Sequence, residues 1–257
     1  MLAGISAYFA IPRIQEAIAK NRARGEMVSI SEGLSVFGTE NSILINDFGF
    51  PPRTSIPFLP AFEIGKYEVS NYQYGLCVKY GDCTVPVVPT NFEDEVIKDL
   101  PVVNVTLIQA NTYCQWLGQR LPNQFEWERA ARGPGLYEWP WGNDQEPIPE
   151  TANMPWKDFS PKGLKPITDN PDGKSPEGIY NLIGNASEWT SSLIVSPIAY
   201  EPSQIWDGNP KSFDGTKTYA RRGGGWRINV DEVATYDADL GLSARNDVGI
   251  RCAANVK

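Results

Sequence analysis

Four positions in the segment 178–190 place oxygen atoms at short intervals along the chain. The Asn181 amide and the Glu188 carboxylate supply side-chain oxygens. The backbone carbonyls of Gly184 and Ala186 lie between them in sequence. Calcium and other hard cations bind six to eight such oxygens at about 2.3–2.6 Å. An isolated Glu more often makes a salt bridge or faces water, so the segment alone leaves a cation site and an ordinary turn both open.

The absence of histidine from the 257 residues restricts the catalytic chemistry open to the chain. Histidine-based metal sites, Ser-His-Asp and Cys-His triads and imidazole acid–base catalysis all require that residue. Any reaction would therefore depend on carboxylates, lysines, tyrosines or cysteines. The net charge of −8 also argues against nucleic-acid binding, because binding phosphates requires a basic face.

The four cysteines of the chain allow three disulfide pairings. Cys77 and Cys83 stand six apart around Gly81 and Asp82, a spacing that suits a small closed loop. An even number of cysteines, without histidine or a C-x-x-C motif, favours disulfides over zinc. Disulfides are typical of extracytoplasmic proteins. Four buried free thiols in a cytosolic protein are the alternative.

The composition predicts a loop-rich domain rather than a helical bundle. The chain has 23 Gly and 21 Pro, and 11% of its residues are aromatic, which suits many turns held by large rings. Alternating residues predict an edge hairpin within 27–39 and a strand from residue 62. Ser70 and Thr106 are typical helix N-caps, so helices are predicted at 71–81 and 107–119.

The first twelve residues are apolar and uncharged, and basic residues follow them. A signal peptide has the opposite order, and the run is shorter than the about 20 residues that span a bilayer. Residues 13–24 predict a short helix with Ile14, Ala17 and Ile18 on one face. We expect the end of a membrane anchor whose beginning is missing from this chain, or an apolar arm that docks on a partner. A frayed terminus is the alternative.

Six motifs resemble, in order, those of the formylglycine-generating-enzyme and sulfatase-modifying-factor family. The resemblance covers residues 27–257, which leaves residues 1–26 as a separate N-terminal arm. It implies an α+β, C-type-lectin-like fold of short antiparallel strands with two main helices and much irregular loop. The motifs are FEIGKYEVSNYQY at 62–74, the stretch 100–133, WPWGN at 139–143, GIYNLIGNASEWT at 178–190, RRGGGW at 221–226 and GIRCAA at 249–254.

The resemblance also implies structural calcium and a second disulfide. One ion is expected on the residues of the opening segment, Asn181, Gly184, Ala186 and Glu188. A second is expected on Asn153 with the carbonyl of Met154, and on Asp158 with the carbonyl of Ser160, although the spacing to the following residues differs by about one from the family pattern. The family often bridges the positions of Cys114 and Cys252. Arg120, Glu126, Glu128 and Arg132 are expected to form a salt-bridge network that fixes a loop.

The catalytic members of the family oxidise a substrate cysteine with two active-site cysteines that bind copper. The matching positions fall near Val233 and Ala238, and no cysteine stands between Trp226 and Ile250. Thiolate is the ligand that Cu(I) prefers, and neither Val nor Ala replaces it. A related branch uses three histidines on iron, and this chain has none. The resemblance therefore implies a non-catalytic member that needs neither copper nor iron.

These observations predict an extracytoplasmic binding or assembly subunit, periplasmic or at the cell surface. Its partners would be proteins of a membrane-bound complex, contacted through loops at 193–218 and 228–248. One alternative is an enzyme with carboxylate chemistry. Another is a glycan-binding module, because Glu-Pro-Ser at 201–203 resembles a calcium-dependent sugar motif whose partner motif is missing. The carboxylates of the first alternative are Asp231, Glu232, Asp237 and Asp239.

Overall fold

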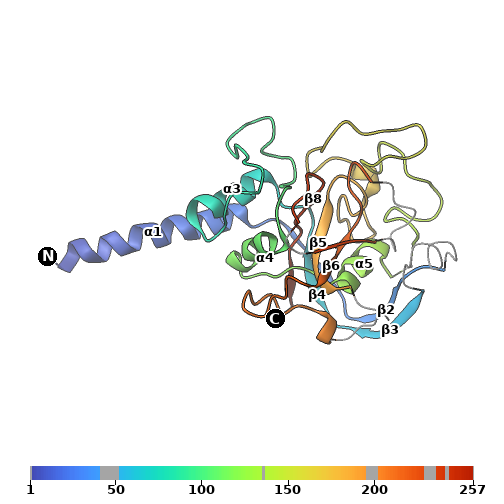
Figure 1. The fold of residues 1–257 in the computed structure, drawn as a ribbon, viewed down its shortest axis with the longest axis horizontal. Coiled ribbons are helices and arrows are strands. Elements are labelled where there is room, and N and C mark those ends of the chain that lie inside the picture. The colour runs from blue at the N-terminus through green and yellow to red at the C-terminus, as the bar shows by residue number, and fades with distance from the viewer. Residues whose placement is uncertain are drawn as a thin grey trace.

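The computed structural model describes residues 2–40, 52–134, 137–194, 202–228, 236–240 and 243–256. Over these residues it has the mixed α+β architecture that the sequence predicts, with short strands in three sheets and long connecting loops (Figure 1). The helices predicted at 71–81 and 107–119 are present as α3 and α4, the one predicted at 13–24 is part of a longer helix, α1, and α5 was not predicted. The helices are α1 (Leu2–Ala23), α3 (Asn71–Tyr80), α4 (Leu107–Trp116) and α5 (Gln124–Arg132).

The strands form a three-stranded, a two-stranded and a four-stranded sheet among the described residues. The first has the antiparallel order β1 (Met27–Ile30), β4 (Phe62–Gly65), β9 (Ala253–Asn255). The second pairs β2 (Gly33–Phe37) with β3 (Thr54–Leu59). The third has the order β7 (Tyr236–Leu240), β6 (Thr218–Arg222), β5 (Ser187–Leu193), β8 (Val248–Gly249), and β5 and β8 run parallel.

The predicted hairpin within residues 27–39 is wrong. β1 pairs with β4 and β2 pairs with β3, so the two consecutive strands belong to different sheets. The connection at Ser31 and Glu32 lacks the Asn-Gly type of sequence that a two-residue hairpin turn requires. Ile30 instead lies opposite Phe62, and both are buried in the core. The long-range apolar pairing therefore decides the topology.

Reciprocal side-chain caps begin the three helices of the body. Ser70 and Gln73 cap α3, and Thr106 caps α4 in the same way, which confirms both predicted starts. Asn123 and Glu126 form the third capping box, at α5. The stretch 120–133 was interpreted from sequence as a loop; the structure corrects this, since most of it is helix α5.

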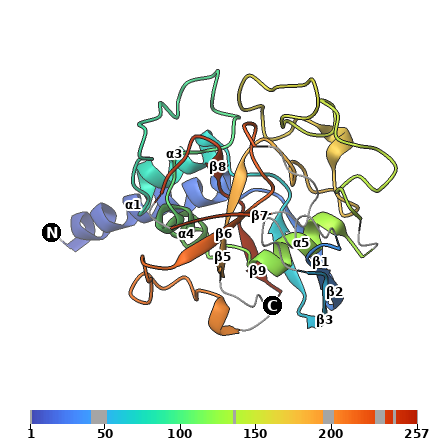
Figure 2. The same cartoon turned by 45° about the vertical axis from the view of Figure 1, so that its right-hand side comes forward.

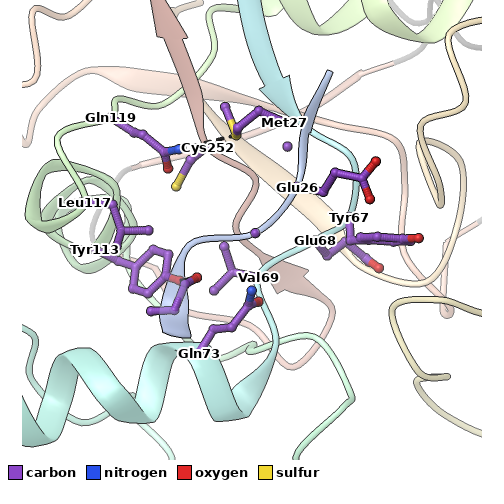
Figure 3. Close-up of a pocket in the computed structure, with 13 residues that line it drawn as sticks. Glu26, Met27, Tyr67, Glu68, Val69, Gln73, Tyr113, Leu117, Gln119 and Cys252 are labelled. Carbon is purple, nitrogen blue, oxygen red and sulfur yellow. Dashed lines mark hydrogen bonds between the residues drawn. The ribbon is translucent and has the colours of Figure 1, made fainter. Parts of the chain in front are cut away.

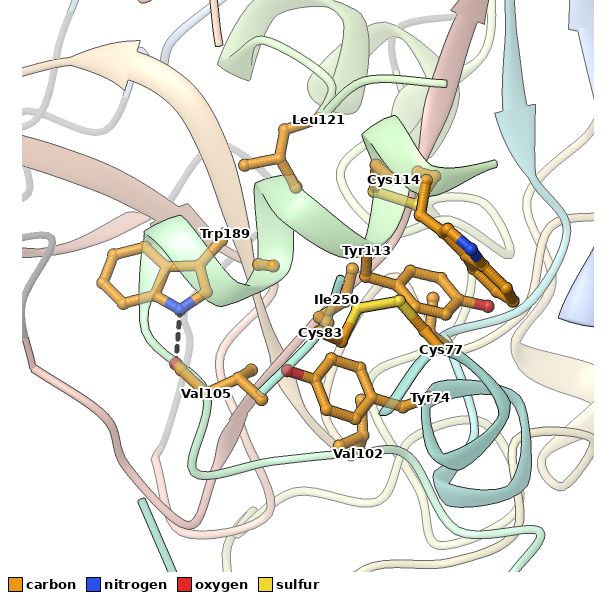
Figure 4. Packing of buried hydrophobic residues seen from close by; sticks show 14 of the residues in the cluster. Tyr74, Cys77, Cys83, Val102, Val105, Tyr113, Cys114, Leu121, Trp189 and Ile250 are labelled. Atoms are coloured by element: carbon orange, nitrogen blue, oxygen red, sulfur yellow. Dashed lines mark hydrogen bonds between the residues drawn. A yellow bond between two sulfur atoms is a disulfide. The ribbon is translucent and has the colours of Figure 1, made fainter. Parts of the chain in front are cut away.

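Both disulfides join elements around one buried core. Cys77–Cys83 links α3 to the loop that follows it, and Cys114–Cys252 links α4 to the segment before β9. The spacing argument for the first and the family argument for the second are thus confirmed. Figure 4 shows the Cys77–Cys83 bridge beside Tyr74 and Tyr113 in this core.

The N-terminal arm is one helix, α1, that begins well before the predicted residue 13 and continues through Pro12. Its last turns pack on the body, where Ala19 and Ala23 are buried and the Tyr113 hydroxyl donates to the Ala23 carbonyl at 3.1 Å. Its beginning projects away from the body in both views (Figures 1 and 2). Among the described residues, no helix combines the length and apolar character needed to cross a bilayer.

Candidate functional site

The segment 178–190 folds around a buried carboxylate that comes from another part of the chain. Glu68 lies between β4 and α3, and its side chain is buried. It accepts hydrogen bonds from Asn181 Nδ2 at 2.9 Å, from Asn185 Nδ2 at 3.0 Å and from the Ala186 backbone N–H at 3.1 Å. Sequence analysis missed Glu68 and Asn185. The available signal was an acidic residue between Tyr67 and Val69, at the strand-to-helix junction inside the motif at 62–74.

Left-handed backbone conformations bend this segment around Glu68. Asn181, Gly184 and Asn185 have φ values of 53°, 80° and 56°. Asn and Gly adopt this conformation at the least steric cost. At Gly184 an added Cβ would also lie 2.9 Å from the carbonyl oxygen of Asn153, so the close approach of two backbones requires glycine there. The backbone geometry of the segment therefore explains why Asn and Gly occupy these positions.

Glu188 takes part in a buried ion pair. Its carboxylate accepts from Arg251 Nη2 at 2.6 Å and Nε at 2.9 Å, and from Trp127 Nε1 at 2.6 Å. Arg251 also donates to the carbonyls of Gly65 and Tyr180, at 2.8 and 2.7 Å. The salt-bridge interpretation of Glu188 thus holds in this structure, and its role as a cation ligand stays a prediction.

Burial disfavours the charged form of Glu68. It raises the pKa of Glu68 to about 8, and repulsion from the Glu188 carboxylate adds to this, while Arg251 and the asparagine amides act in the opposite direction. At neutral pH the Glu68 carboxyl group is therefore largely protonated beside the Glu188–Arg251 ion pair. A cation bound at Glu68 would favour the ionised form and lower this pKa.

The oxygen types in the cluster fit the predicted calcium. The Glu68 carboxylate, the Asn181 side chain and the carbonyls of Gly184 and Ala186 are hard oxygen ligands of the kind that this ion prefers. Within the part of the chain that the structure describes, no group of three or more His, Cys, Asp or Glu side chains could hold a metal. An ion here would therefore depend on amide and backbone oxygens as well as carboxylates.

The residues predicted for the second ion differ in burial. Asn153 is buried and donates from Nδ2 to Asn185 Oδ1 at 3.0 Å, so it belongs to the Glu68 cluster. Met154 is buried beside it in sequence, whereas Asp158 and Ser160 are exposed. The second ion stays a prediction.

A small cavity of about 30 Å³ adjoins Glu68. It lies between the chain segment after α1, with Glu26, and Tyr113 of α4 with Leu117 just after that helix (Figure 3). Gln73 adds a polar side chain to its largely apolar wall. Glu68 therefore lies between this cavity and the asparagine cluster.

The region that matches the family's catalytic centre is only partly described. Val233, Asp231, Glu232 and Glu201 lie outside the described residues, as do the side chains of Ala238, Asp237 and Asp239. The predicted binding loops at 193–218 and 228–248 are described only in part. Beside them lies an open cavity of about 630 Å³. Arg227, Arg245 and Asp247 line it, and Arg245 Nη2 pairs with Asp247 Oδ2 at 2.8 Å.

The predicted salt bridges are present beside helix α5. Arg120 pairs with Glu126 at 2.7 Å, and Arg132 pairs with Glu128 at 3.0 Å. Glu128 also pairs with Arg222 at 2.6 Å, from strand β6. The cluster of Glu128, Arg132 and Arg222 is buried, and it joins α5 to the four-stranded sheet. These charges therefore have structural partners, as expected of a scaffold.

The fold and these motifs place the chain in a known family. Residues 14–256 match the model of the sulfatase-modifying factor enzyme 1-like domain, and the chain belongs to this family. It is 27% identical to formylglycine-generating enzyme of Bos taurus over 288 residues, which cover 90% of this chain and 75% of the relative. It is 35% identical to inactive C-alpha-formylglycine-generating enzyme 2 of Mus musculus over 175 residues, 61% of this chain and 50% of the relative.

A bacterial relative matches over a similar length of this chain. The uncharacterized protein YfmG of Bacillus subtilis is 28% identical over 270 residues, 90% of this chain. The chain spans about half the length of YfmG, at 54%, and of the mouse relative, at 50%. The family thus includes proteins named as enzymes and proteins named as inactive.

Solved structures share the fold at low sequence identity. PvdO from Pseudomonas aeruginosa has a TM-score of 0.72 at 19% identity, over 91% of this chain and 95% of that one. CarF has a TM-score of 0.66 at 19% identity, over 91% of this chain and all of the other. These similarities confirm the predicted fold class.

Proposed function

We propose that this chain is a non-catalytic binding or assembly subunit of an extracytoplasmic, membrane-associated protein complex. The observation that carries the proposal is that its cysteines are paired in disulfides. All four form the disulfides Cys77–Cys83 and Cys114–Cys252, and the sequence has no histidine. A copper–thiolate centre needs thiolates, and an imidazole–iron centre needs histidines. The 257 residues supply neither group.

The family comparison supports a non-catalytic role without establishing it. The mouse relative at 35% identity is named as an inactive formylglycine-generating enzyme. Loss of the reaction therefore occurs elsewhere on this scaffold. Loops on a body that is fixed by disulfides and buried ion pairs suit binding.

Two disulfides support the proposed compartment. Disulfides form and persist mainly in oxidising environments such as the periplasm and the cell surface. Cys114–Cys252 spans 138 residues and joins α4 to the end of the chain, so it contributes to the fold of most of the domain.

Structural calcium is part of the proposal. The Glu68 carboxylate, the Asn181 amide oxygen and the carbonyls of Gly184 and Ala186 would hold the ion. The burial of the Glu68 carboxyl group supports it, because a cation would stabilise the ionised form that burial disfavours. The ion would supply positive charge to a structural centre, and no reaction depends on it.

A peptide assay tests the lack of catalysis. The purified chain is incubated with copper, oxygen and a cysteine-bearing peptide, and the peptide is followed by mass spectrometry beside an active formylglycine-generating enzyme. We expect the peptide thiol to remain unchanged with this chain. Conversion of the cysteine to an aldehyde would overturn the proposal.

Native mass spectrometry of the protein extracted from its source membrane tests the assembly role. We expect a complex with at least one other protein, and calcium in the mass of this subunit. A free monomer in that extract would contradict an assembly role even if the peptide assay shows no activity.

A further inference from the structure

The outer face of α1 carries an exposed apolar stripe. Ile11, Ile14 and Ile18 follow helical spacing, so they lie on one face, and their side chains are 56%, 57% and 49% exposed. Ala19 and Ala23 occupy the other side of the helix and are buried against the body. The stripe therefore points away from the domain, toward a surface that the domain itself does not cover.

The charge of α1 differs in sign from that of the rest of the chain. Residues 1–26 have a net charge of +2, and the whole chain has −8, so residues 27–257 carry −10. Arg13 and Arg22 are exposed; helical geometry places Arg22 in line with the isoleucine stripe, one turn after Ile18, and Arg13 on the opposite side of the helix, near Lys20. The charges that give +2 are those of Arg13, Lys20, Arg22 and Arg24 with Glu16 and Glu26.

We infer that α1 lies in the plane of an anionic lipid surface, with the isoleucine stripe in the acyl boundary and the domain on the aqueous side. A helix with an exposed apolar stripe and a net positive charge binds at such an interface through buried apolar area and attraction to anionic headgroups. Arg22, at the end of the stripe, reaches the headgroups directly. The body at −10 is repelled by the same surface, which sets the orientation. This inference rests on the membrane association proposed above and names its physical partner.

The last turns of the helix are fixed to the domain, which makes the geometry rigid. Arg24 Nη2 donates to the Leu117 carbonyl at 3.1 Å, and Trp116 Nε1 donates to Glu16 Oε1 at 3.2 Å. Lys20 pairs with Glu16 at 2.8 Å on the same side. These contacts hold the body-facing side and leave the isoleucine stripe available. The segment 2–10 continues the helix and has no charged residue in its sequence.

Vesicle sedimentation of the full chain tests the inference. We expect binding to vesicles of phosphatidylcholine mixed with phosphatidylglycerol, weaker binding to phosphatidylcholine alone, and loss of binding as salt is raised. The variant Ile11→Ser/Ile14→Ser/Ile18→Ser should lower the partition coefficient by about a hundredfold, because three half-exposed apolar side chains no longer enter the lipid. The variant Arg22→Gln should lower it by about fivefold on anionic vesicles and little on neutral ones, and Arg13→Gln, on the opposite side of the helix, should lower it less.

Matched controls separate the stripe from general surface properties. Val85, Val87 and Val96 are 53%, 64% and 83% exposed in a loop away from the stripe, so their triple change to Ser should leave vesicle binding unchanged. Lys162→Gln/Lys211→Gln removes two exposed charges of the body and should not weaken binding. Unchanged thermal unfolding of each variant shows that the fold is intact.

Two outcomes overturn the inference. Equal binding of the isoleucine variant and the valine control would show that the stripe does not contact lipid. If the full chain fails to bind vesicles while native mass spectrometry still shows a membrane-extracted protein complex, α1 docks on protein and only the proposed function survives. The inference would also fail if the chain does not bind lipid but self-associates, and the isoleucine variant abolishes that self-association. The stripe would then contact a second copy of the chain.

Discussion

Glu68 and Glu128 show two ways in which this protein buries a carboxylate. Glu128 pairs with two guanidinium groups, those of Arg132 and Arg222. Glu68 instead accepts from amide groups and lies near Glu188, so burial and repulsion raise its pKa to about 8. A buried charge is stable only when it is paired. The first residue is therefore part of the scaffold, whereas burial of the second favours its neutral form.

The pKa of Glu68 predicts how stability depends on pH when divalent ions are removed. Its value rises from the ordinary 4.5 to about 8 in the folded state. Between these values the folded state holds a proton that the unfolded state has lost, so the free energy of unfolding decreases as pH rises, by up to about 1.4 kcal/mol per pH unit. Urea unfolding in EDTA at several pH values measures this slope. The Glu68→Gln variant should lack this contribution; an identical slope in the variant would contradict the assignment.

Glu128→Ala should destabilise the fold strongly. It removes the carboxylate that bonds two buried guanidinium groups, and breaking such a buried pair costs about 3–5 kcal/mol. Glu93 pairs with Lys79 at 3.5 Å on the surface and is the matched control, for which a change of at most about 1 kcal/mol is expected. Denaturant unfolding of both variants provides the comparison. Similar losses in the two would show that the buried cluster is not structural.

Helix α4 links distant parts of the fold through covalent and capping contacts. Thr106 caps its start, and Cys114 joins its last turns to Cys252 near the end of the chain. The Trp189 indole of strand β5 donates at 2.9 Å to the carbonyl of Val105, which lies just before α4 (Figure 4). The helix is thus tied to the central sheet and to the C-terminal segment at once.

The two disulfides should differ in their contribution to stability. The loop of Cys114–Cys252 spans 138 residues and that of Cys77–Cys83 spans six. The chain-entropy model assigns about 5 kcal/mol to the first and about 2 kcal/mol to the second. We therefore expect Cys114→Ser/Cys252→Ser to lower the free energy of unfolding more than Cys77→Ser/Cys83→Ser. Equal losses in denaturant titrations would show that loop length does not control the effect.

The whole molecule combines a negatively charged domain with a positively charged helix at its edge. The domain belongs to the sulfatase-modifying-factor family, and both of its disulfides lie in the core around α3 and α4. The helix α1 packs on this core through its last turns and projects beyond it (Figure 2).

Calcium should stabilise the whole domain, because the proposed ion joins two parts of the chain that only the fold brings together. At free calcium about a hundred times Kd, the gain is about 2.7 kcal/mol. Thermal unfolding with EDTA and with added calcium measures it. Glu68→Gln should reduce the shift, whereas Asp158→Asn tests the second predicted ion separately. An unchanged transition on removal of divalent ions would exclude a structural ion.

Local patterns allowed much of this protein to be predicted from its sequence. The caps Ser70 and Thr106, the Cys77–Cys83 loop and the order of the family motifs each depend on residues that are close in the chain. The same is true of the salt bridges Arg120–Glu126 and Arg132–Glu128. These features can be predicted because each depends on the geometry of residues that are close together in the chain.

Tertiary structure alone decided the contacts between distant residues. Glu68 reaches Asn181 across 113 positions, and β1 pairs with β4 rather than with β2. Asn153 joins the same cluster, while Asp158 lies exposed at the surface. Nothing in the local sequence specifies these pairings, because burial of apolar side chains and satisfaction of buried polar groups are properties of the complete fold.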